Sequence, residues 1–489
     1  MANRPGPGGK CRDVTRVLLI DIYGWQGAVC SNRPYPNLGI AYLSAALERS
    51  GHQVAVLDMN NAAISDRQIL SFIEQNKVDL VGLSVKTSTM KATRRVGQLI
   101  SAQFPNVPLV LGGPHATIAA TKLVSEPWVT AIYCGEGEEA FPRICDALDS
   151  GEALHEIPGL LTAEAIHSGI PVTPVRVEAL DSLPFPNFQI FPAEVFSAIK
   201  LDYPLLTSRG CPYGCTYCSV PAISGRRFRS RSPANILSEL SNAKECLGIR
   251  KFHIIDDAFN VDSKRAKEIC HELIRNEVDF IWSCPNGLRA DLVDEELAKL
   301  MYQSGCRAVM VGIESVDPAV LAAARKGESI TDIERGIHLL RQTGMTVGGY
   351  FIIGLPGDSP EAQEEAVNFA RRNNISAHFN MLVPYPGTLL WDWVTVNGRL
   401  LGDIEESLHF ADSPAKVAPI FETNDFTAGQ RLEAYRLVHT RTGRFDLLIP
   451  SRPGTLAYFL QVMKFLWQYD RGMLCPWVLN SLMALAKRA

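Results

Sequence analysis

Short apolar runs alternate with amphipathic stretches through the first third of the chain. The apolar runs are rich in β-branched residues and bounded by turn-forming residues, which is typical of strands. We expect strands at residues 14–21, 53–58, 79–84, 108–112 and 130–134. The stretches between them carry a helical period, as at residues 38–50, 65–75 and 89–103. Five strands separated by helices predict a doubly wound parallel sheet, in which ligands bind at the carboxyl ends of the strands.

The same alternation returns after a proline-rich segment. We expect six further strands, at residues 203–208, 251–255, 279–283, 308–313, 346–353 and 376–383. Six β/α units predict an open, partial (β/α)6 TIM barrel with its chemistry at the carboxyl ends of the strands. The predicted α/β chain comprises a flexible tail (1–13), a Rossmann-like domain (14–150), a proline-rich linker (151–203), the barrel (204–395) and a helical C-terminal region (396–489).

The composition is that of a soluble protein of two or three domains, with 489 residues of which 46% are hydrophobic and 20% charged. A net charge of −4 gives no electrostatic reason to expect nucleic acid as a partner. The first residues lack the apolar core of a signal peptide, and twelve cysteines are spread along the chain, so we expect a reducing cytoplasm.

No apolar run reaches the ~18 residues that a membrane-spanning helix needs. The apolar segments 454–467 and 473–486 are separated by polar residues. We interpret them as a helical cap on the core, with peripheral membrane contact as the less favoured alternative.

Three cysteines follow the first strand of the predicted barrel with Cys-x-x-x-Cys-x-x-Cys spacing. Cys211, Cys215 and Cys218 lie on a loop that also contains Gly210 and Gly214. A structural zinc site needs four ligands, and no fourth Cys or His is near. A cubane iron–sulfur cluster held by three thiolates keeps one iron open to a substrate or cofactor. The alternatives are three unrelated buried cysteines or a zinc loop.

This loop, including the aromatic Tyr217 before the last cysteine, resembles the cluster loop of radical S-adenosylmethionine (radical SAM) enzymes. The resemblance implies a [4Fe-4S] cluster whose open iron binds the amino and carboxylate groups of S-adenosylmethionine (AdoMet). It also implies that an electron from the cluster cleaves AdoMet to a 5′-deoxyadenosyl radical.

Residues 14–150 resemble the cobalamin-binding domain that precedes the radical domain in many of these enzymes. The matching segments are residues 36–43, 112–117 and 134–138. No Gly-x-Gly-x-x-Gly follows the first strand, which disfavours a dinucleotide. The Asp-x-His-x-x-Gly motif of other cobalamin proteins is also absent, which leaves the lower cobalt ligand open.

The loops at the carboxyl ends of the expected strands supply the residues predicted to bind cobalamin. They are Tyr23, Ser84, Thr87, Ser88, Gly112, Gly113, His115, Gly135, Glu136 and Gly137. Glycine lets the backbone approach a large flat ligand closely. His115 is a candidate cobalt ligand, although a loop histidine more commonly bonds to the backbone.

The resemblance also assigns AdoMet-binding residues to the ends of the barrel strands. Besides Tyr217, they are Asp256 and Asp257 for the amino group, Arg289 for the AdoMet carboxylate or a substrate anion, Glu314 for the ribose hydroxyls, and Phe351 and Ile353 beside the adenine. Three of these assignments have an alternative: a helix N-cap for the aspartates, a surface salt bridge for the arginine, and a plain buried strand for the last two.

Two further features are read as structural. The basic run at residues 226–233 is interpreted as a surface or interdomain loop carrying ion pairs, in preference to a nucleic-acid patch. Cys284 and Cys306 are interpreted as buried free thiols, unless they serve as a methyl relay or hydrogen-atom donor.

The combined resemblance implies a cobalamin-dependent radical SAM methyltransferase, of the kind called class B. The expected reaction is transfer of a methyl group from methylcobalamin to an unactivated carbon of a small-molecule or natural-product intermediate, after hydrogen abstraction by the deoxyadenosyl radical. The expected electron donor is a protein such as flavodoxin or ferredoxin. The alternatives are a cyclase, oxidase or ring-rearranging enzyme with the same cofactors, and a non-catalytic iron–sulfur carrier.

Overall fold

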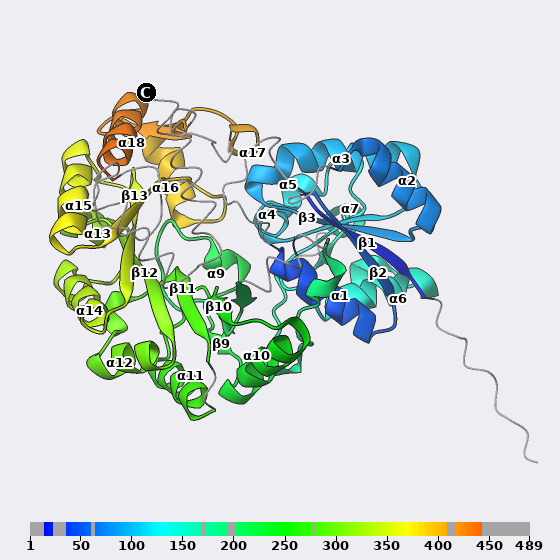
Figure 1. Cartoon of the computed structure of the whole chain (residues 1–489). Coiled ribbons are helices and arrows are strands. Elements are labelled where there is room, and N and C mark those ends of the chain that lie inside the picture. Colours follow the sequence, from blue (N-terminus) through cyan, green and yellow to red (C-terminus); the bar gives the residue numbers. More distant parts are fainter. Residues whose placement is uncertain are drawn as a thin grey trace, which may run out of the picture. The chain divides into compact units, whose positions relative to one another are not determined.

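The computed structural model describes residues 14–22, 36–59, 64–167, 173–192, 195, 202–276, 279–407 and 417–442. The chain divides into two compact units, residues 1–198 and 199–489. Each unit is built on a six-stranded sheet (Figure 1). The predicted tail, residues 1–13, lies outside the described residues.

The first unit has the doubly wound sheet that the sequence predicts, with the strand order β2-β1-β3-β4-β5-β6. Its strands are β1 (Arg16–Asp21), β2 (Gln53–Asp58), β3 (Leu80–Ser84), β4 (Leu109–Gly112), β5 (Ala131–Tyr133) and β6 (Leu160–Leu161). Strands β1 to β5 pair in parallel. Strand β6 adds a short antiparallel edge that was not predicted.

The helices of this unit are α1 (Leu38–Arg49), α2 (Asp66–Asn76), α3 (Met90–Gln103), α4 (Pro114–Ile118), α5 (Ala120–Leu123), α6 (Ala140–Ser150) and α7 (Ala163–His167). Single turns of 3-10 helix occur at Thr87–Thr89, Leu154–Glu156, Leu180–Ser182 and Phe188–Ile190. Figure 1 shows α2 and α3 on one face of the sheet and α1 and α6 on the other. Helices on both faces explain why β1 is almost entirely buried.

Much of the predicted linker packs on the first unit. Besides β6, Val175 forms a parallel bridge with Gly135 at the end of β5. Further on, the Asn187 N–H donates to the carbonyl of Ala41 in α1 (3.0 Å). These backbone bonds make the described part of residues 151–192 a component of this unit.

The second unit contains the six parallel strands of the predicted barrel, in the order β14-β13-β12-β11-β10-β7. They are β7 (Tyr203–Leu205), β10 (Lys251–Ile254), β11 (Ile281–Leu288), β12 (Cys306–Glu314), β13 (Thr346–Ile353) and β14 (Ser376–Met381). The sheet is open, because β14 and β7 are its two edges. Neighbouring strands are consecutive in the barrel order, as the β/α repeat requires.

The helices between these strands are α9 (Val220–Ile223), α10 (Pro233–Leu247), α11 (Ser263–Arg275), α12 (Glu295–Gln303), α13 (Pro318–Ala323), α14 (Ile330–Gln342) and α15 (Pro360–Arg372), with a 3-10 turn at Ala290–Leu292. The chain continues through α16 (Leu389–Asn397), β15 (Gly398–Leu400), α17 (Ile404–Ser407), β16 (Phe421–Thr423) and α18 (Ala428–Thr442). Figure 1 shows α11, α12, α14 and α15 along the outer side of the sheet.

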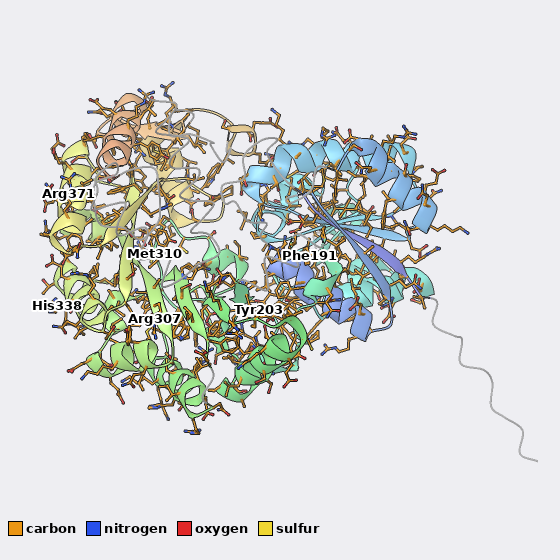
Figure 2. All side chains as sticks on the ribbon, in the orientation of Figure 1. Phe191, Tyr203, Arg307, Met310, His338 and Arg371 are labelled. Atoms are coloured by element: carbon orange, nitrogen blue, oxygen red, sulfur yellow. The ribbon has the colours of Figure 1, made fainter. Side chains whose placement is uncertain are left out.

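The two faces of the second sheet differ in exposure. Along β13, Phe351 and Ile353 are fully buried, whereas Tyr350 and Ile352 are partly exposed. Alternate residues of a strand point to opposite faces, so Tyr350 and Ile352 share the more open face. Strand pairing puts Gly312 of β12 and His378 of β14 on this same face beside Tyr350. We call this the inner face of the barrel; Met310, labelled in Figure 2, belongs to it.

A buried arginine anchors α18 to the barrel. Arg431 is 2% exposed and donates from Nη1 to the Gly354 carbonyl (3.1 Å) and from Nε to the Phe426 carbonyl (2.9 Å). The apolar segments 454–467 and 473–486 lie outside the described residues. Among the described helices, none combines the length and the apolar character needed to cross a membrane.

The packing of α3 on Trp128 gives a test of the first unit. A Cβ atom on Gly97 would lie 2.1 Å from the Trp128 ring, and this ring is only 5% exposed. We expect Gly97→Ala to destabilise the unit by about 1–3 kcal/mol, because the added methyl overpacks a buried contact. Urea unfolding followed by tryptophan fluorescence measures the loss.

Gly429→Ala is the matched control, because this helical glycine of α18 is exposed and has open space around it. There the change is expected to be neutral or slightly stabilising. Equal unfolding midpoints for the two variants would contradict the packing.

Candidate functional site

The loop with the three cysteines is closed at its base by a small antiparallel hairpin. Strand β8 (Ser208–Arg209) pairs with β9 (Arg229–Ser230), so residues 210–228 form the loop. Gly210 adopts φ +84°, and a Cβ atom there would lie 2.4 Å from the Arg227 carbonyl oxygen. Only glycine fits this close approach of the two ends of the loop.

The three cysteine thiols are partly exposed and close enough to influence one another's pKa. Cys211, Cys215 and Cys218 are all free. Burial raises the pKa of Cys218 to about 12, and the charges of Cys215 and Cys211 act in the same direction. Burial and the Cys215 charge likewise raise the pKa of Cys211. Such thiols stay protonated alone but ionise when they bind a metal centre.

The donor set fits an iron–sulfur cluster. Within the described part of the chain, no three His, Cys, Asp or Glu side chains are grouped so that they would hold one metal ion. A cubane cluster places each thiolate on a different iron, so its three sulfurs need not converge on a single ion. Three soft sulfur donors on one glycine-rich loop suit that arrangement.

Asp256, one of the two aspartates predicted to face AdoMet, instead fastens the start of the cluster loop. It is 1% exposed and accepts from the Thr207 N–H (2.6 Å), the Thr207 hydroxyl and the Ser208 hydroxyl (2.6 Å). Burial raises the pKa of Asp256, while Arg265 and these hydrogen bonds oppose the rise. Its carboxylate is therefore occupied by the chain itself.

Asp257, unlike Asp256, lies at the surface of the protein. Its side chain is exposed, and its Oδ2 accepts from the Gly210 N–H at 3.0 Å, next to Cys211. Its charge acts on the thiols of Cys211 and Cys218. Of the predicted pair, Asp257 is thus the carboxylate beside the cluster thiols with room to meet a cationic amino group.

The basic run at residues 226–233, which ends the loop and includes β9, is only partly the surface segment that we expected. Arg226 and Arg227 are exposed, but Arg229 and Arg231 are each 4% exposed. Arg231 pairs with Glu239 of α10 (2.5 Å) and donates to the Leu206 carbonyl (2.8 Å). The sequence did not reveal this burial, because the partner, Glu239, lies in the next helix.

Glu314 sits at the end of β12 as predicted, in an uncommon conformation and beside an unpredicted lysine. Its φ is +66°, and the strand register shifts between Gly312 and Glu314. The Lys326 Nζ lies 3.2 Å from the Glu314 Oε1, and both side chains are nearly buried. A Cβ atom on Gly312 would lie 2.9 Å from this oxygen and 3.0 Å from Nζ. Because Gly312 has no side chain, the ion pair fits on the inner face of the barrel.

Tyr217 joins the cluster loop to this ion pair. Burial raises the pKa of Tyr217 well above its usual value, and the charge and hydrogen bond of Glu314 add to the effect, as does the charge of Cys215. The ring also packs against a buried apolar cluster that includes Leu390 and Phe421. Its position between Cys215 and Glu314 makes Tyr217 a wall of the site.

Arg289 is neither the open anion clamp nor the surface salt bridge that the sequence suggested. It is 6% exposed and pairs with Asp291 (2.9 Å) and Glu328 (2.8 Å). It also donates to the Lys326 carbonyl (3.0 Å), and its guanidinium stacks on the Tyr213 ring at 3.6 Å. Arg289 therefore holds the cluster loop against the segment that carries Lys326.

The side chains of Phe351 and Ile353 do not face the inner side of the barrel. Phe351 stacks on Phe379 at 4.8 Å, and both Phe351 and Ile353 are 0% exposed. The predicted apolar wall on the inner face is therefore not formed by these two side chains. Only the backbone of these two residues remains available to a ligand on the inner face.

In the first unit, polar groups meet at the carboxyl ends of β1 and β3. Asn37 donates from Nδ2 to Asp21 Oδ1 (2.8 Å) and to the Ser84 hydroxyl (3.0 Å). The Asp21 Oδ2 is buried and has no hydrogen-bond partner in the described part of the chain. Gly112, which pairs with Ser84 on the next strand, has open space where a side chain would be. An unpaired acceptor and an open glycine at the same edge of the sheet suit a ligand rich in amide donors, as cobalamin is.

Several predicted cobalamin residues bond within the chain instead. His115 is 1% exposed, and its Nδ1 lies 3.0 Å from the Thr87 hydroxyl, so the ring is held inside the unit. A Cβ atom on Gly135 would lie 2.0 Å from the Val175 carbonyl oxygen, and Glu136 accepts from the Val177 N–H (2.8 Å). Gly135 and Glu136 therefore pack against and bond to the segment that follows β6.

The remaining predicted cobalamin positions in this unit differ in exposure and backbone conformation. Gly113 adopts φ +100° and directly precedes α4, Ser88 and Gly137 are partly exposed, and Tyr23 lies outside the described residues. The structure thus brings together Ser84, Gly112 and Gly113 along neighbouring strands, with Asp21 as a member that the sequence did not single out.

Cys284 and Cys306 are the buried thiols that we expected by default. They are 1% and 0% exposed, and burial raises the pKa of each thiol well above its usual value.

The roles of the two adjacent aspartates are separable by mutation. Asp256→Asn is expected to lower both the iron bound per chain and the unfolding midpoint, because it weakens charge-assisted bonds of about 1.5–3 kcal/mol each. Asp257→Asn is expected to keep the fold and most of the iron. Iron analysis and thermal unfolding of both variants measure the split, and equal losses would contradict it.

Comparison with known proteins agrees with this geometry. The model of the radical SAM superfamily matches residues 205–370, and the model of the B12 binding domain matches residues 26–145. An uncharacterized methyltransferase of Pyrococcus horikoshii is 32% identical over 371 residues, which are 75% of this chain and 80% of that protein. An anaerobic magnesium-protoporphyrin IX monomethyl ester cyclase of Rubrivivax gelatinosus is 27% identical over 429 residues, 86% of this chain and 75% of that protein.

A third relative, the cytidylyl-2-hydroxyethylphosphonate methyltransferase of Streptomyces wedmorensis, is 28% identical over 434 residues, 77% of this chain and 80% of that protein. The fold matches that of the radical SAM methyltransferase TsrM from Kitasatospora setae, solved with cobalamin and a [4Fe-4S] cluster. The TM-score is 0.70 at 19% identity, over 91% of this chain and 92% of that one.

The three-thiol loop at the mouth of a partial barrel, the doubly wound sheet before it and these matches confirm the resemblance and the cofactors inferred from it: a [4Fe-4S] cluster, AdoMet and cobalamin. The chain belongs to the radical SAM superfamily, among the enzymes of that superfamily that carry a B12 binding domain.

Proposed function

We propose that this enzyme is a cobalamin-dependent methyltransferase that acts on an unactivated carbon of a small-molecule or natural-product intermediate. The observation that carries the proposal is the pairing, in one chain, of a three-thiol loop and a B12 binding domain. Relatives that match most of this chain include proteins named as methyltransferases. An unactivated C–H bond requires such cofactors, because no acid or base of a protein deprotonates it near pH 7.

The cluster and AdoMet supply the radical, and cobalamin supplies the methyl group. Around them, we assign Cys211, Cys215 and Cys218 to the cluster. Asp257 accepts hydrogen bonds from the AdoMet amino group, and Glu314 accepts them from the ribose hydroxyls. Lys326 holds the carboxylate of Glu314 in place, since the two charged groups lie 3.2 Å apart and are nearly buried.

Other residues act through these groups. Asp256 and Arg289 are positioning residues of the cluster loop, since their polar atoms bond within the chain. Tyr217 bounds the site, and the backbone of Phe351 and Ile353 forms the edge beside the adenine. In the first unit we assign Ser84, Gly112 and Gly113 to cobalamin, with Asp21 as an acceptor for its amide groups.

We propose a reducing cytoplasm as the location, because every cysteine in the described part of the chain is free and a [4Fe-4S] cluster is sensitive to oxidation. A protein electron donor such as flavodoxin or ferredoxin then supplies the electron. The substrate is a small molecule.

A second candidate is a cyclase or other rearranging enzyme that uses the same cofactors without net methyl transfer. The relative named as an anaerobic magnesium-protoporphyrin IX monomethyl ester cyclase favours it. The methyltransferase is preferred because more of the compared proteins carry that name.

Label from methyl-labelled AdoMet decides between them. Cell extract lacking the gene is incubated anaerobically with the reconstituted enzyme, reductant and labelled AdoMet, and products are separated by mass spectrometry. We expect one labelled CH₃ in place of hydrogen in one product, together with deoxyadenosine. The same extract with the Cys215→Ala variant, which removes one cluster ligand, is expected to give neither.

An unlabelled product formed together with deoxyadenosine would favour the second candidate. Deoxyadenosine formation that persists in the Cys215→Ala variant would contradict the assignment of the cluster.

The ion pair over Gly312 gives a sharper test of the AdoMet site. Gly312→Ala places a methyl group within about 3 Å of both charged atoms of the pair, so Glu314 must move. We expect the affinity for AdoMet to fall by roughly 10-fold or more, which corresponds to about 1.4 kcal/mol. Isothermal titration of reconstituted protein with AdoMet measures it.

Lys326→Met is expected to lower the affinity for AdoMet to a similar extent. Lys326→Arg is expected to retain part of the affinity that Lys326→Met loses. Unchanged AdoMet binding in Gly312→Ala would remove Glu314 from the site.

A further inference from the structure

Polar and small residues end four neighbouring strands at the carboxyl edge of the first sheet. Strand pairing places Asp58, Asp21, Ser84 and Gly112 side by side on β2, β1, β3 and β4 (Figure 1). Adjacent strands of a sheet lie about 4.8 Å apart, so each position is close to the next. We call these four residues the edge row. A ligand bound at this edge of the sheet meets them together.

The two aspartates make one end of the edge row acidic. Asp21 is 1% exposed and Asp58 is 0% exposed. Burial raises the pKa of Asp21, whereas the charge of Lys86 and the hydrogen bond from Asn37 lower it. Lys86 is exposed, so water and salt screen its charge. A carboxylate away from water acts strongly on any charge that a ligand brings beside it.

Asn37 fixes the orientation of the Asp21 carboxylate. Its Nδ2 donates to Asp21 Oδ1 (2.8 Å) and to the Ser84 hydroxyl oxygen (3.0 Å). Its Oδ1 accepts from the Ile40 N–H (3.2 Å), which caps the first turn of α1. One amide side chain thus joins β1, β3 and α1. The carboxylate cannot turn without breaking its bond to Asn37, so its second oxygen keeps one direction.

That second oxygen has no function within the described part of the chain. Asp21 Oδ2 is buried, and no hydrogen-bond donor reaches it among the described residues. Native proteins rarely leave a buried acceptor unpaired, because its lost bonds to water are not replaced. Gly112, further along the edge row, has open space where a side chain would be. Both features are explained by a large ligand that brings an N–H or O–H donor to Oδ2.

The edge row can distinguish a primary amide from a carboxylic acid. An amide donates an N–H to Oδ2, whereas an acid is ionised near pH 7 and offers no donor. The ionised acid also places a second negative charge beside Asp21. Cobalamin carries primary amides around its corrin ring, and hydrolysis turns them into carboxylates. Repulsion of the wrong form adds to attraction of the right one in setting specificity.

We propose that Asp21 is a specificity-determining residue, which selects the fully amidated corrinoid and rejects forms with a carboxylate in place of a side-chain amide. Asn37 is the residue that positions it. The inference rests on the proposed function, since it takes this edge as the cobalamin site. It goes further by naming the chemical form of the cofactor that the protein accepts.

The test measures corrinoid binding and does not depend on turnover. Full-length protein is dialysed to equilibrium against hydroxocobalamin or against each of its monocarboxylates, in which mild acid has hydrolysed one side-chain amide. Corrin absorbance on the two sides of the membrane gives each Kd. We expect at least one monocarboxylate to bind the wild type about 10-fold or more weakly than hydroxocobalamin, because its acid falls beside Asp21.

Asp21→Asn is expected to lower this ratio of Kd values to about 2-fold or less, because the negative charge is removed and the new Nδ2 donates to a carboxylate. Asn37→Ser keeps a residue that caps helices but no longer holds Asp21, and we expect an intermediate ratio. Loss of a merely structural bond would weaken all the corrinoids equally and leave the ratio unchanged.

The matched control is Glu74→Gln, which makes the same change in net charge at an exposed position in the last turn of α2. It is expected to keep the wild-type ratio. Thermal unfolding compares the stability of the variants. If Asp21→Asn does not fold, the ratio measured on the wild type still decides.

Three results would overturn the inference while leaving the proposed function in place. The first is a wild type that binds every monocarboxylate as tightly as hydroxocobalamin, or more tightly. The second is a folded Asp21→Asn variant that keeps the wild-type ratio. The third is a Glu74→Gln variant that loses the ratio to the same extent. A wild type that binds none of the corrinoids would instead contradict the proposed function.

Discussion

The buried carboxylate of Asp256 is the interaction on which the rest of the site depends. It lies at the end of β10 and collects hydrogen bonds from Thr207 and Ser208, the residues at which the chain enters the cluster loop. Carboxylates bonded in this way contribute more than neutral pairs, and an unpaired carboxylate in the same place costs several kcal/mol. Asp256 therefore fixes the start of the loop to the barrel, and the hairpin of β8 and β9 closes the base of the loop.

On the inner face, the absence of a side chain at Gly312 also supports the site. Gly312 makes room for the carboxylate of Glu314 and the ammonium of Lys326, which would otherwise be displaced from the strand. Tyr217 connects this pair to the cluster loop, and Arg289 holds the backbone of Lys326 against Tyr213. Charges of both signs are thus kept close together at the mouth of the barrel and away from water. Their interactions are stronger there than in water, because the dielectric constant of the protein interior is lower.

Much of this was predictable from the sequence, because strand periodicity and the cysteine spacing are local signals. The eleven expected strands are present with boundaries shifted by a few residues, and the cluster loop follows the first barrel strand. What the sequence did not predict depends on contacts between distant residues. Lys326 meets Glu314 across a helix, Arg231 finds Glu239 in the next helix, and β6 pairs with β5 from within a segment read as a linker. The face on which Phe351 points was also misjudged, since a buried strand lacks a polar alternation to fix it.

The central claim is that one iron of the cluster has no ligand from the protein and is available to AdoMet. The most direct measurement is electron–nuclear double resonance on the anaerobically reconstituted, reduced protein, with AdoMet labelled with ¹⁵N in its amino group and ¹⁷O in its carboxylate. The account predicts hyperfine coupling of both labels to the cluster. Absence of coupling from a fully reduced cluster, or zinc in place of iron at the three thiols, would contradict it.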